Sequence, residues 1–273
     1  MIQIENLTYN YLGSKKKVFD GLSFSLSENG IYGLLGKNGM GKSTLLYLMT
    51  GLLRAKSGTV KVDGRDMSRR LPESLGEMFI VPEEYSLPHV SLKEFVSMNR
   101  DFYPRFSEEV LRRCLDDFEL PPALHLKELS MGQKKKVYMS IALAAGTRFV
   151  FMDEPTNGLD IPSKSLFRKV VANSMTDDRM LIISTHQVHD VEALLDHILI
   201  LDSKGLLLNS PVAGLTERYD FGVRQPAEMD SDVVYAEPSL QGNNVIARHV
   251  EGTPETQVNI ELLFNAVIKG IIK

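Results

Sequence analysis

Residues 36–44 read Gly36-Lys37-Asn38-Gly39-Met40-Gly41-Lys42-Ser43-Thr44, and this stretch decides the fold. It fits the phosphate-binding loop pattern, which is a glycine, four residues, and then glycine, lysine and serine. Glycines let the backbone curl so that several N–H groups point at one anion, and the helix that follows adds its positive end. An apolar run over 30–36 precedes the loop, and helical spacing over 44–53 follows it. We therefore predict a strand, a loop and a helix that together hold phosphate.

The loop residues have separate predicted roles. Lys42 is expected to reach the outer phosphates, and Ser43 is expected to hold Mg²⁺. The residues expected to contact the bound nucleotide are Gly36, Asn38, Gly39, Gly41, Lys42, Ser43 and Thr44. The alternative interpretation is an ordinary strand–turn–helix that binds no ligand.

Two carboxylates follow a second apolar run. Residues 149–152 are Phe-Val-Phe-Met, and Asp153 and Glu154 come directly after them. Ligands of open parallel sheets bind at the carboxyl ends of the strands. We therefore expect Asp153 to support Mg²⁺, directly or through water, and Glu154 to lie near an attacking water. The alternative is a strand followed by a solvated acidic turn.

Composition and charge narrow the class of protein. The chain is 43% hydrophobic and 24% charged, which is the usual globular balance. Its 31 Lys and Arg residues against 35 Asp and Glu residues leave a net charge of −4, so no nucleic-acid partner is expected. The single cysteine, Cys114, cannot form an internal disulfide, which indicates a reducing compartment, and its apolar helical neighbours favour a core position. No secretory signal and no apolar stretch near the ~18 residues needed to cross a bilayer is present, so any membrane role is expected to come through a partner.

Length and the pattern along the chain predict roughly two domains, or one large domain with additions. Strand-like alternation and turns dominate residues 1–60, and two amphipathic helical patterns lie between 84 and 130. From residue 148, apolar runs alternate with helices, which predicts a covered parallel sheet. Beyond residue 215, two strands around Gly242-Asn243-Asn244 predict a hairpin, and 259–269 predicts a closing helix.

The segment Leu129-Ser130-Met131-Gly132-Gln133 resembles the signature of the ATP-binding cassette (ABC) ATPases, which is usually Leu-Ser-Gly-Gly-Gln. The stretch 153–160, Asp-Glu-Pro-Thr-Asn-Gly-Leu-Asp, is similar to the family's second nucleotide motif running into its D-loop. Ser184-Thr185-His186 resembles the switch histidine after its strand, and Tyr11 stands where the family often places an aromatic residue against adenine. The resemblance covers residues 1 to about 210, with the motifs in the expected order.

The resemblance implies a fold and a set of site residues. The fold is α/β, with a P-loop NTPase parallel sheet core, an N-terminal antiparallel β subdomain, a helical insert at about 84–145 and a small C-terminal α+β extension. The ABC ATPase domain is expected over 1–214 and the extension over 215–273. The implied catalytic residues are Lys42, Glu154 and His186. Further implied nucleotide contacts are Tyr11, Ser130, Gly132, Gln133 and Asp160.

Some assignments keep an alternative. Without the resemblance, His186 is interpreted as a surface histidine, and Tyr9 competes with Tyr11 because an alternating strand buries either one. Lys134, Lys135 and Lys136 follow the signature in the first turn of a helix, where cations oppose the helix dipole. They either meet polyphosphate or form a solvated basic face, and the solvated face is the simpler interpretation.

Two positions depart from the family pattern. Position 131 is Met where the family commonly has Gly, although Gly132 is kept. Val81-Pro82-Glu83 has glutamate where the family usually has the glutamine of the Q-loop. Glu83 can accept hydrogen bonds or approach Mg²⁺, and it is therefore included among the expected nucleotide and metal contacts, but an ionised carboxylate cannot donate.

The function implied by the resemblance is that of an ATP-hydrolysing nucleotide-binding subunit of an ABC transporter. It would use ATP and Mg²⁺, dimerise with a second ABC ATPase subunit as a homodimer or heterodimer, and drive a separate transmembrane permease from the cytoplasmic side of the cell membrane. The wording of 153–160 and the insert resemble the bacterial drug and antibiotic exporters, which favours export. The alternatives are a soluble ABC-type ATPase acting on DNA or ribosomes, and a GTPase or small-molecule kinase.

Docking to the permease is expected just after Glu83. Tyr85 and Leu87 lie between Pro82 and Pro88, a setting that suits an exposed apolar anchor, and His89 and Val90 continue the segment. The alternative is that Tyr85 and Leu87 fold back on the insert.

Overall fold

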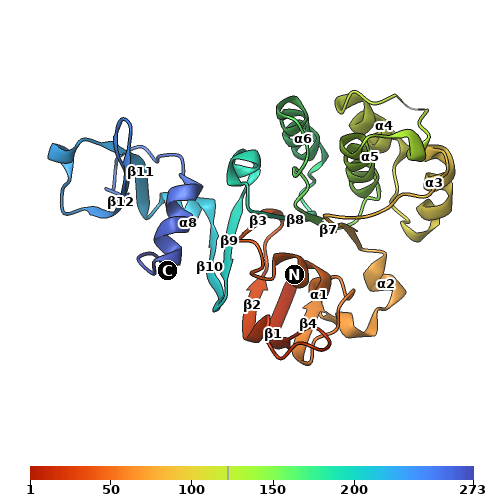
Figure 1. Ribbon diagram of the computed structural model, residues 1–273, viewed down its shortest axis with the longest axis horizontal. Coiled ribbons are helices and arrows are strands. Elements are labelled where there is room, and N and C mark those ends of the chain that lie inside the picture. The colour runs from red at the N-terminus through yellow and green to blue at the C-terminus, as the bar shows by residue number, and fades with distance from the viewer. Residues whose placement is uncertain (122) are drawn as a thin grey trace.

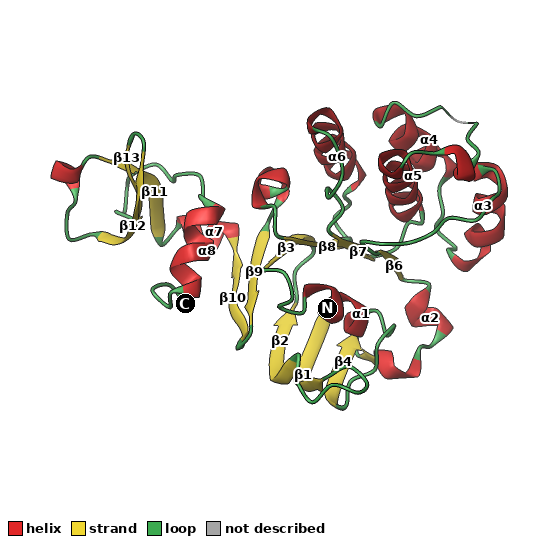
Figure 2. Cartoon of the chain, in the orientation of Figure 1, coloured by secondary structure: helices red, strands yellow, loops and turns green. Residues whose placement is uncertain are grey.

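A six-stranded sheet forms the centre of the chain, in a computed structural model that describes residues 1–121 and 123–273. Its strand order is β10-β9-β3-β8-β7-β6 (Figures 1 and 2). All neighbouring pairs are parallel except β10 with β9. The strands are β3 (Gly30–Leu35), β6 (Met78–Val81), β7 (Phe149–Asp153), β8 (Met180–Thr185), β9 (His197–Asp202) and β10 (Gly205–Pro211). Every residue of β7 and β8 is buried, which explains their unbroken apolar sequence and confirms the predicted covered parallel sheet.

The N-terminal part forms a four-stranded antiparallel sheet of order β2-β1-β4-β5. Its strands are β1 (Ile2–Tyr9), β2 (Phe19–Leu26), β4 (Ser57–Val62) and β5 (Arg65–Asp66). Helix α1 (Lys42–Met49) lies between this sheet and one face of the central sheet, and the three share one apolar core. That core fixes where α1 begins, and therefore where the preceding loop is held.

The helices of the insert cover the opposite face of the central sheet. They are α3 (Leu92–Asn99), α4 (Glu108–Asp117) and α5 (Met131–Ala144), which gather at one end of the molecule in Figure 1, with α6 (Ile161–Ser174) beside them and the short α2 (Pro72–Leu75) before β6. Ser91 and Glu94 form the capping box that the sequence indicated at the start of α3. Cys114 is buried in the core of this layer, as expected.

The C-terminal extension is α7 (Val212–Thr216), the sheet β11 (Tyr219–Arg224), β12 (Val233–Ser239) and β13 (Gly242–Arg248), and the closing helix α8 (Ile260–Ile268). The predicted hairpin pairs β12 with β13, but its turn is Leu240-Gln241, and Gly242-Asn243-Asn244 lies inside β13. Side chains of α8 belong to the same apolar core as the insert, so the extension is packed against the cassette. The boundary at residue 214, which falls inside α7, stays a prediction.

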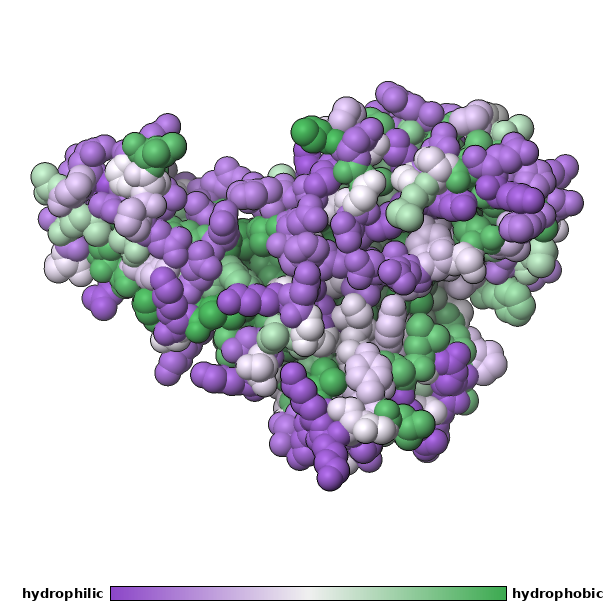
Figure 3. Space-filling view, viewed as in Figure 1, coloured by the Kyte–Doolittle hydropathy of each residue, from purple (hydrophilic) through white to green (hydrophobic). Residues whose placement is uncertain are grey.

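Figure 3 shows how hydrophilic and hydrophobic side chains are distributed on one face of the molecule. The face seen in Figure 3 is mostly hydrophilic, and hydrophobic side chains show in the hollow beside the C-terminal extension. Among the described residues, no helix is long and apolar enough to cross a membrane.

Arg179, just before β8, joins the ends of two helices to the sheet. Its side chain is buried, and Nη2 donates to the Leu143 carbonyl near the end of α5 at 3.3 Å, while Nη1 donates to the Ser174 carbonyl at the end of α6. Nε donates to the Thr147 carbonyl at 3.3 Å. A cation at helix carboxyl ends is favourable, and this one satisfies three buried acceptors.

Replacing Arg179 with methionine should therefore lower the free energy of unfolding by about 1–3 kcal/mol, because buried carbonyls lose their donors. Urea unfolding monitored by circular dichroism measures the change. Arg179→Lys, which keeps the charge but not the three-way geometry, should fall between methionine and the native residue. A methionine variant as stable as the native protein would show that the three hydrogen bonds contribute nothing net.

Candidate nucleotide site

A cavity of about 500 Å³ lies where β3, β7 and β8 end. Parallel register brings their carboxyl ends to one edge, with Leu35 opposite Thr185 and Asp153 opposite Ser184. The cavity is lined by Tyr11, Val18, Asn38, Gly39, Gly41, Lys42, Ser43, Thr44, Glu83, Glu154, Asn157 and His186. The loop after β3 and the acidic pair after β7, which are over 100 positions apart in sequence, therefore share one site, as the sequence predicted.

The loop after β3 depends on two glycines. Gly41 has φ 98° directly before α1, and a Cβ there would lie 2.7 Å from Val18 Cγ1. A Cβ on Gly36 would lie 2.6 Å from the Leu201 carbonyl oxygen. The loop can therefore keep this path, which ends at the amino end of α1, only without side chains at these positions.

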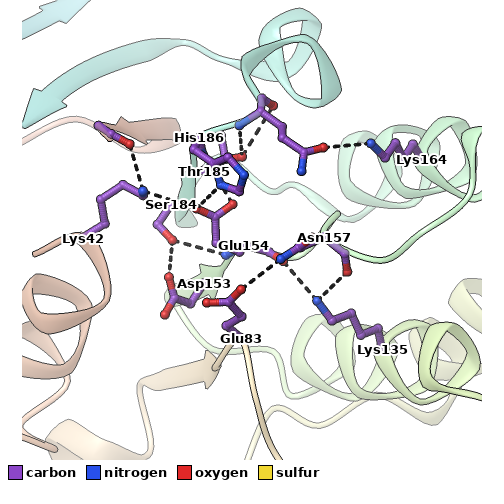
Figure 4. A network of polar contacts seen from close by, with 12 residues as sticks. Lys42, Glu83, Lys135, Asp153, Glu154, Asn157, Lys164, Ser184, Thr185 and His186 are labelled. Carbon is purple, nitrogen blue, oxygen red and sulfur yellow. Dashed lines mark hydrogen bonds and ion pairs between the residues drawn. The ribbon is translucent and has the colours of Figure 1, made fainter. Parts of the chain in front are cut away.

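Lys42 is buried and lines the cavity. Its Nζ donates to the Gly36 carbonyl at 2.9 Å and lies 3.3 Å from Glu154 Oε1 (Figure 4). The ammonium group is thus held by the loop itself and aimed at the acidic pair. An anion in the cavity would meet a cation that is already desolvated and positioned.

Asp153 ends β7 with one carboxylate oxygen satisfied and one not. Ser184 Oγ donates to Oδ1, whereas Oδ2 is buried and has no hydrogen-bond partner among the described residues. Burial raises the pKa of Asp153 above its ordinary value of 3.8, hydrogen bonds from Ser184 and Ser43 lower it, and the charges of Glu154 and Glu83 add to the rise. A buried carboxylate oxygen without a donor, next to the Ser43 hydroxyl, fits a hard divalent cation that takes oxygen ligands.

The described part of the chain offers only a few oxygen atoms that could bind a metal ion at this site, and this small number suits Mg²⁺. Within residues 1–121 and 123–273, no group of three or more His, Cys, Asp or Glu side chains could hold a metal ion by itself. Mg²⁺ usually binds through one or two protein oxygens and completes its shell with phosphate oxygens and water. Asp153 and Ser43 therefore fit a cation that arrives with a polyphosphate.

Glu154 and His186 form a pair that lines the cavity beside Lys42. His186 Nδ1 lies 2.9 Å from Glu154 Oε1, and the His186 backbone N–H donates to Glu154 Oε2 at 3.3 Å. Glu154 has φ 46°, which is unfavourable for a residue with a Cβ and indicates that the surrounding contacts hold it there. His186 lies on the chain directly after β8 and is exposed, and its contact with Glu154 supports the predicted catalytic role over that of a surface histidine without a partner.

Glu83 reaches the same cavity from the loop after β6. Its Oε1 accepts a hydrogen bond from Asn157 Nδ2 at 2.9 Å. Lys135 lies behind Asn157, with Nζ donating to the backbone carbonyls of Asn157 at 2.7 Å and Glu154 at 3.2 Å (Figure 4). Lys135 is only 8% exposed, so the solvated basic face expected of the three lysines is wrong for this one. The sequence pattern did not single out Asn157 or Lys135 as site residues.

Tyr11 lies at the rim of the cavity. It is 45% exposed, and its hydroxyl group is 2.7 Å from Thr44 Oγ1 at the start of α1. Tyr9 is buried, 7% exposed, and its ring meets the ring of Tyr11 edge-on at 5.2 Å between centroids. Of the two tyrosines, only Tyr11 presents a ring to a ligand in this cavity.

The signature residues lie outside this cavity. Ser130 caps α5 by accepting from the Gln133 backbone N–H, and Gln133 accepts in return from the Ser130 N–H, so the two form a capping box. Asp160 caps α6 in a similar way by accepting from the Ser163 N–H. Within one chain, then, the predicted nucleotide contacts divide into a cavity set and an exposed set at the amino ends of two helices.

The segment after Glu83 contains the predicted docking residues. The ring of Tyr85 packs on Tyr138 of α5 with centroids 4.6 Å apart, and its hydroxyl oxygen is buried without a partner among the described residues. Burial raises the pKa of Tyr85 well above its ordinary range. Leu87 and Val90 are also half-buried against the core, and His89 is exposed. Tyr85 and Leu87 therefore fold back partly on the insert, which favours the alternative to an exposed anchor, and docking at this segment stays a prediction.

Comparison with known proteins defines the class. Residues 19–157 match the family described as ABC transporter. The ABC transporter ATP-binding protein YtrB of Bacillus subtilis (strain 168) is 26% identical over 234 residues, covering 85% of this chain and 78% of YtrB. The linearmycin resistance ATP-binding protein LnrL of the same organism is 27% identical over 272 residues, covering 91% and 86%. A solved ATP-binding subunit of an ABC transporter shares the fold, with a TM-score of 0.69 and 22% identity over 79% of this chain and 91% of that one.

The chain belongs to the ABC transporter family. It is an ATP-hydrolysing nucleotide-binding subunit, whose ATPase activity is coupled to transport. ATP-binding subunits of this family dimerise and work with membrane permeases. This membership confirms the predicted fold class and excludes the GTPase and small-molecule kinase alternatives.

The raised pKa of Asp153 predicts a gain of stability on removing its charge. Because the folded-state pKa lies above the unfolded value, the ionised carboxylate destabilises the native protein above that pKa. Without nucleotide or metal, Asp153→Asn should therefore raise the free energy of unfolding at pH 7.5 by about 0.5–2 kcal/mol, the usual gain at a functionally strained site.

The gain should shrink as the pH falls through the raised pKa toward 3.8, because the native carboxylate then becomes neutral too. Thermal unfolding across pH 4–8 measures both effects. A variant that is less stable than the native protein at pH 7.5 would contradict the assignment of a desolvation penalty to Asp153.

Proposed function

We propose that this chain binds Mg²⁺-ATP in the cavity at the ends of β3, β7 and β8, and that hydrolysis there powers export through a separate permease. The observation that carries the proposal is the convergence of three features on one cavity. The desolvated Lys42 ammonium group and the carboxylate–imidazole pair of Glu154 and His186 line it. Asp153, with a buried carboxylate oxygen that has no donor among the described residues, lies directly before Glu154.

Each of these groups has a distinct role in the proposed reaction. The loop N–H groups and Lys42 bind the β- and γ-phosphates, and Tyr11 stacks on the adenine ring. Ser43 and Asp153, with Glu83 as a further candidate, would hold Mg²⁺, which would neutralise charge on the phosphates. Glu154 accepts a proton from the attacking water, and His186 holds Glu154 in place and donates to the γ-phosphate.

The ion pair between Lys42 and Glu154 gives this site two arrangements. The same Nζ atom that binds Glu154 at 3.3 Å is the one assigned to the phosphates. A polyphosphate that takes up the ammonium group frees Glu154 Oε1 for water, so nucleotide binding and release of the catalytic carboxylate are coupled.

The exposed signature set completes the site from a second subunit. Ser130, Gly132, Gln133 and Asp160 lie at helix amino ends outside the cavity of their own chain, where N–H groups favour an anion. In the proposed dimer they cover the γ-phosphate bound to the partner. Hydrolysis removes that shared ligand and reopens the dimer, which is the step that resets the permease.

The proposed direction is export, and the proposed location is the cytoplasmic side of the cell membrane. Support for export comes from LnrL, a linearmycin resistance ATP-binding protein whose match covers 91% of this chain. The helical insert is the proposed contact with the permease. With Tyr85 turned inward, its exposed apolar side chains at Met98 and Phe102 are better placed for that contact.

Lys42→Ala should lower ATP turnover about 100-fold or more and weaken nucleotide binding, because a charge-assisted contact to the phosphates is lost. Phosphate release and calorimetric titration with ATP measure the two effects. Lys37→Ala, which changes an exposed lysine of the same loop, is the matched control. Native turnover in a folded Lys42→Ala protein would place the active site elsewhere.

Glu154→Gln should keep ATP binding and lower ATP turnover about 10²- to 10⁴-fold, because the amide keeps the shape of the side chain and cannot take up the proton. With hydrolysis blocked, an ATP-bound dimer should accumulate, and size-exclusion chromatography with light scattering detects it. If this variant still turns over ATP at the native rate, Glu154 is not the group that activates water.

A further inference from the structure

Lys135 is a buried ammonium group with no assigned task in the reaction. It lies on α5, five residues after the signature serine, and it points away from solvent toward the chain between β7 and α6. Its Nζ donates to two backbone carbonyls, those of Glu154 and Asn157. Burying an ammonium group is costly unless its donors are satisfied and charge lies nearby, so this placement needs a compensating gain.

The two carbonyls belong to the turn that aims Glu154. The Asn157 backbone N–H donates back to the Glu154 carbonyl at 3.2 Å, so residues 154–157 close a tight turn whose ends both meet Lys135. Glu154 begins this turn at φ 46°, a conformation that relaxes unless neighbouring groups hold it. The Lys135 ammonium group donates to both ends of the turn and therefore ties them together.

The same turn connects Lys135 to Glu83. The Asn157 side chain donates to Glu83 at 2.9 Å while its carbonyl accepts from Lys135 at 2.7 Å. Glu83 and Asn157 also line two cavities, the nucleotide cavity on one side and a cavity of about 570 Å³ beside α5 on the other. Lys135 lines only the second of these two cavities. It therefore acts on a bound nucleotide through the residues that line both cavities and not by direct contact.

The carboxylates near Lys135 give a second reason for a buried ammonium group at this position. Glu83 and Glu154 line a cavity that is assigned to a polyanion, and Asp153 lies directly before Glu154 at the end of β7. Burial lowers the pKa of Lys135, and these three carboxylates raise it again, which marks their proximity. Glu83 adds the negative charge that a glutamine at the same position would not.

We propose that Lys135 is a positioning residue: its ammonium group fixes the 154–157 turn, and with it the Glu154 carboxylate, and it offsets the charge of Glu83 through Asn157. The inference rests on the proposed role of Glu154 in hydrolysis. It links the signature helix to the catalytic carboxylate within one chain, so a displacement of α5 is transmitted to Glu154.

The kinetic test compares Lys135→Met with Lys135→Arg and Lys136→Met. Methionine keeps the volume and removes the donors, so kcat should fall about 10- to 100-fold, the cost of misplacing a catalytic group, while KM for ATP stays within about 3-fold. Arginine keeps charge and donors and should restore kcat to within about 3-fold. Lys136→Met, one residue along the same helix and half-buried, should match the native protein.

The charge test adds Glu83→Gln. The change is measured in the native and in the Lys135→Met background, and relative to its effect in the native background it should raise kcat in Lys135→Met, because one uncompensated charge is removed. Additive effects of the two changes would overturn the charge role. A Lys135→Met enzyme with native kcat, or a folded Lys135→Arg enzyme as slow as the methionine variant, would overturn the positioning role.

A second readout does not depend on hydrolysis. Hydrogen exchange of the Asn157 amide, which closes the turn, should become faster in Lys135→Met and remain unchanged in Lys136→Met. If the native protein did not hydrolyse ATP, the proposed function would fail while this measurement still decided whether Lys135 holds the turn. Should Lys135→Met not fold, Lys135→Gln, which loses the charge and keeps one donor group, is measured by the same criteria.

Discussion

Negative charge crowded at the carboxyl ends of β6 and β7 is the constraint on which the rest of the structure depends. Asp153 and Glu154 are buried at the carboxyl end of β7, and Glu83 lies in the loop after the neighbouring strand β6. Two buried ammonium groups, those of Lys42 on α1 and Lys135 on α5, approach Glu154 from opposite sides. Asp153 Oδ2 is buried without a hydrogen-bond partner among the described residues, which supports the proposal that the cavity binds a metal-bound polyphosphate.

The charged groups around Glu154 are carried by separate layers of the fold. Lys42 is carried by α1, whose core joins the antiparallel sheet to one face of the central sheet. Lys135 is carried by α5, which packs in the core on the other face. The acidic pair sits on the strand between them, so movement of either layer relative to β7 changes the charge balance at Glu154.

The sequence predicted the parts of the site whose chemistry is local, and missed those that depend on packing. The phosphate loop follows from a short pattern, because glycines at this spacing before lysine and serine are specific to phosphate binding, and an apolar run that ends in Asp153 and Glu154 indicates a buried strand. Lys135 looked like one of three solvated lysines, because the sequence gives the helical position of a side chain but not which neighbour covers it. The orientation of Tyr85 stayed open for the same reason: whether an aromatic residue between prolines faces solvent depends on Tyr138, more than 50 positions away.

Binding of a non-hydrolysable ATP analogue to the native chain, with Mg²⁺ and with EDTA, tests the central claim most directly. If the buried acidic cavity is made for a metal-bound polyphosphate, calorimetric titration should give an affinity at least about 10-fold higher with Mg²⁺. Saturating analogue at about 100 times its Kd should then raise the free energy of unfolding by about 2.7 kcal/mol. Equal affinity in EDTA, or no binding in either condition, would contradict the account.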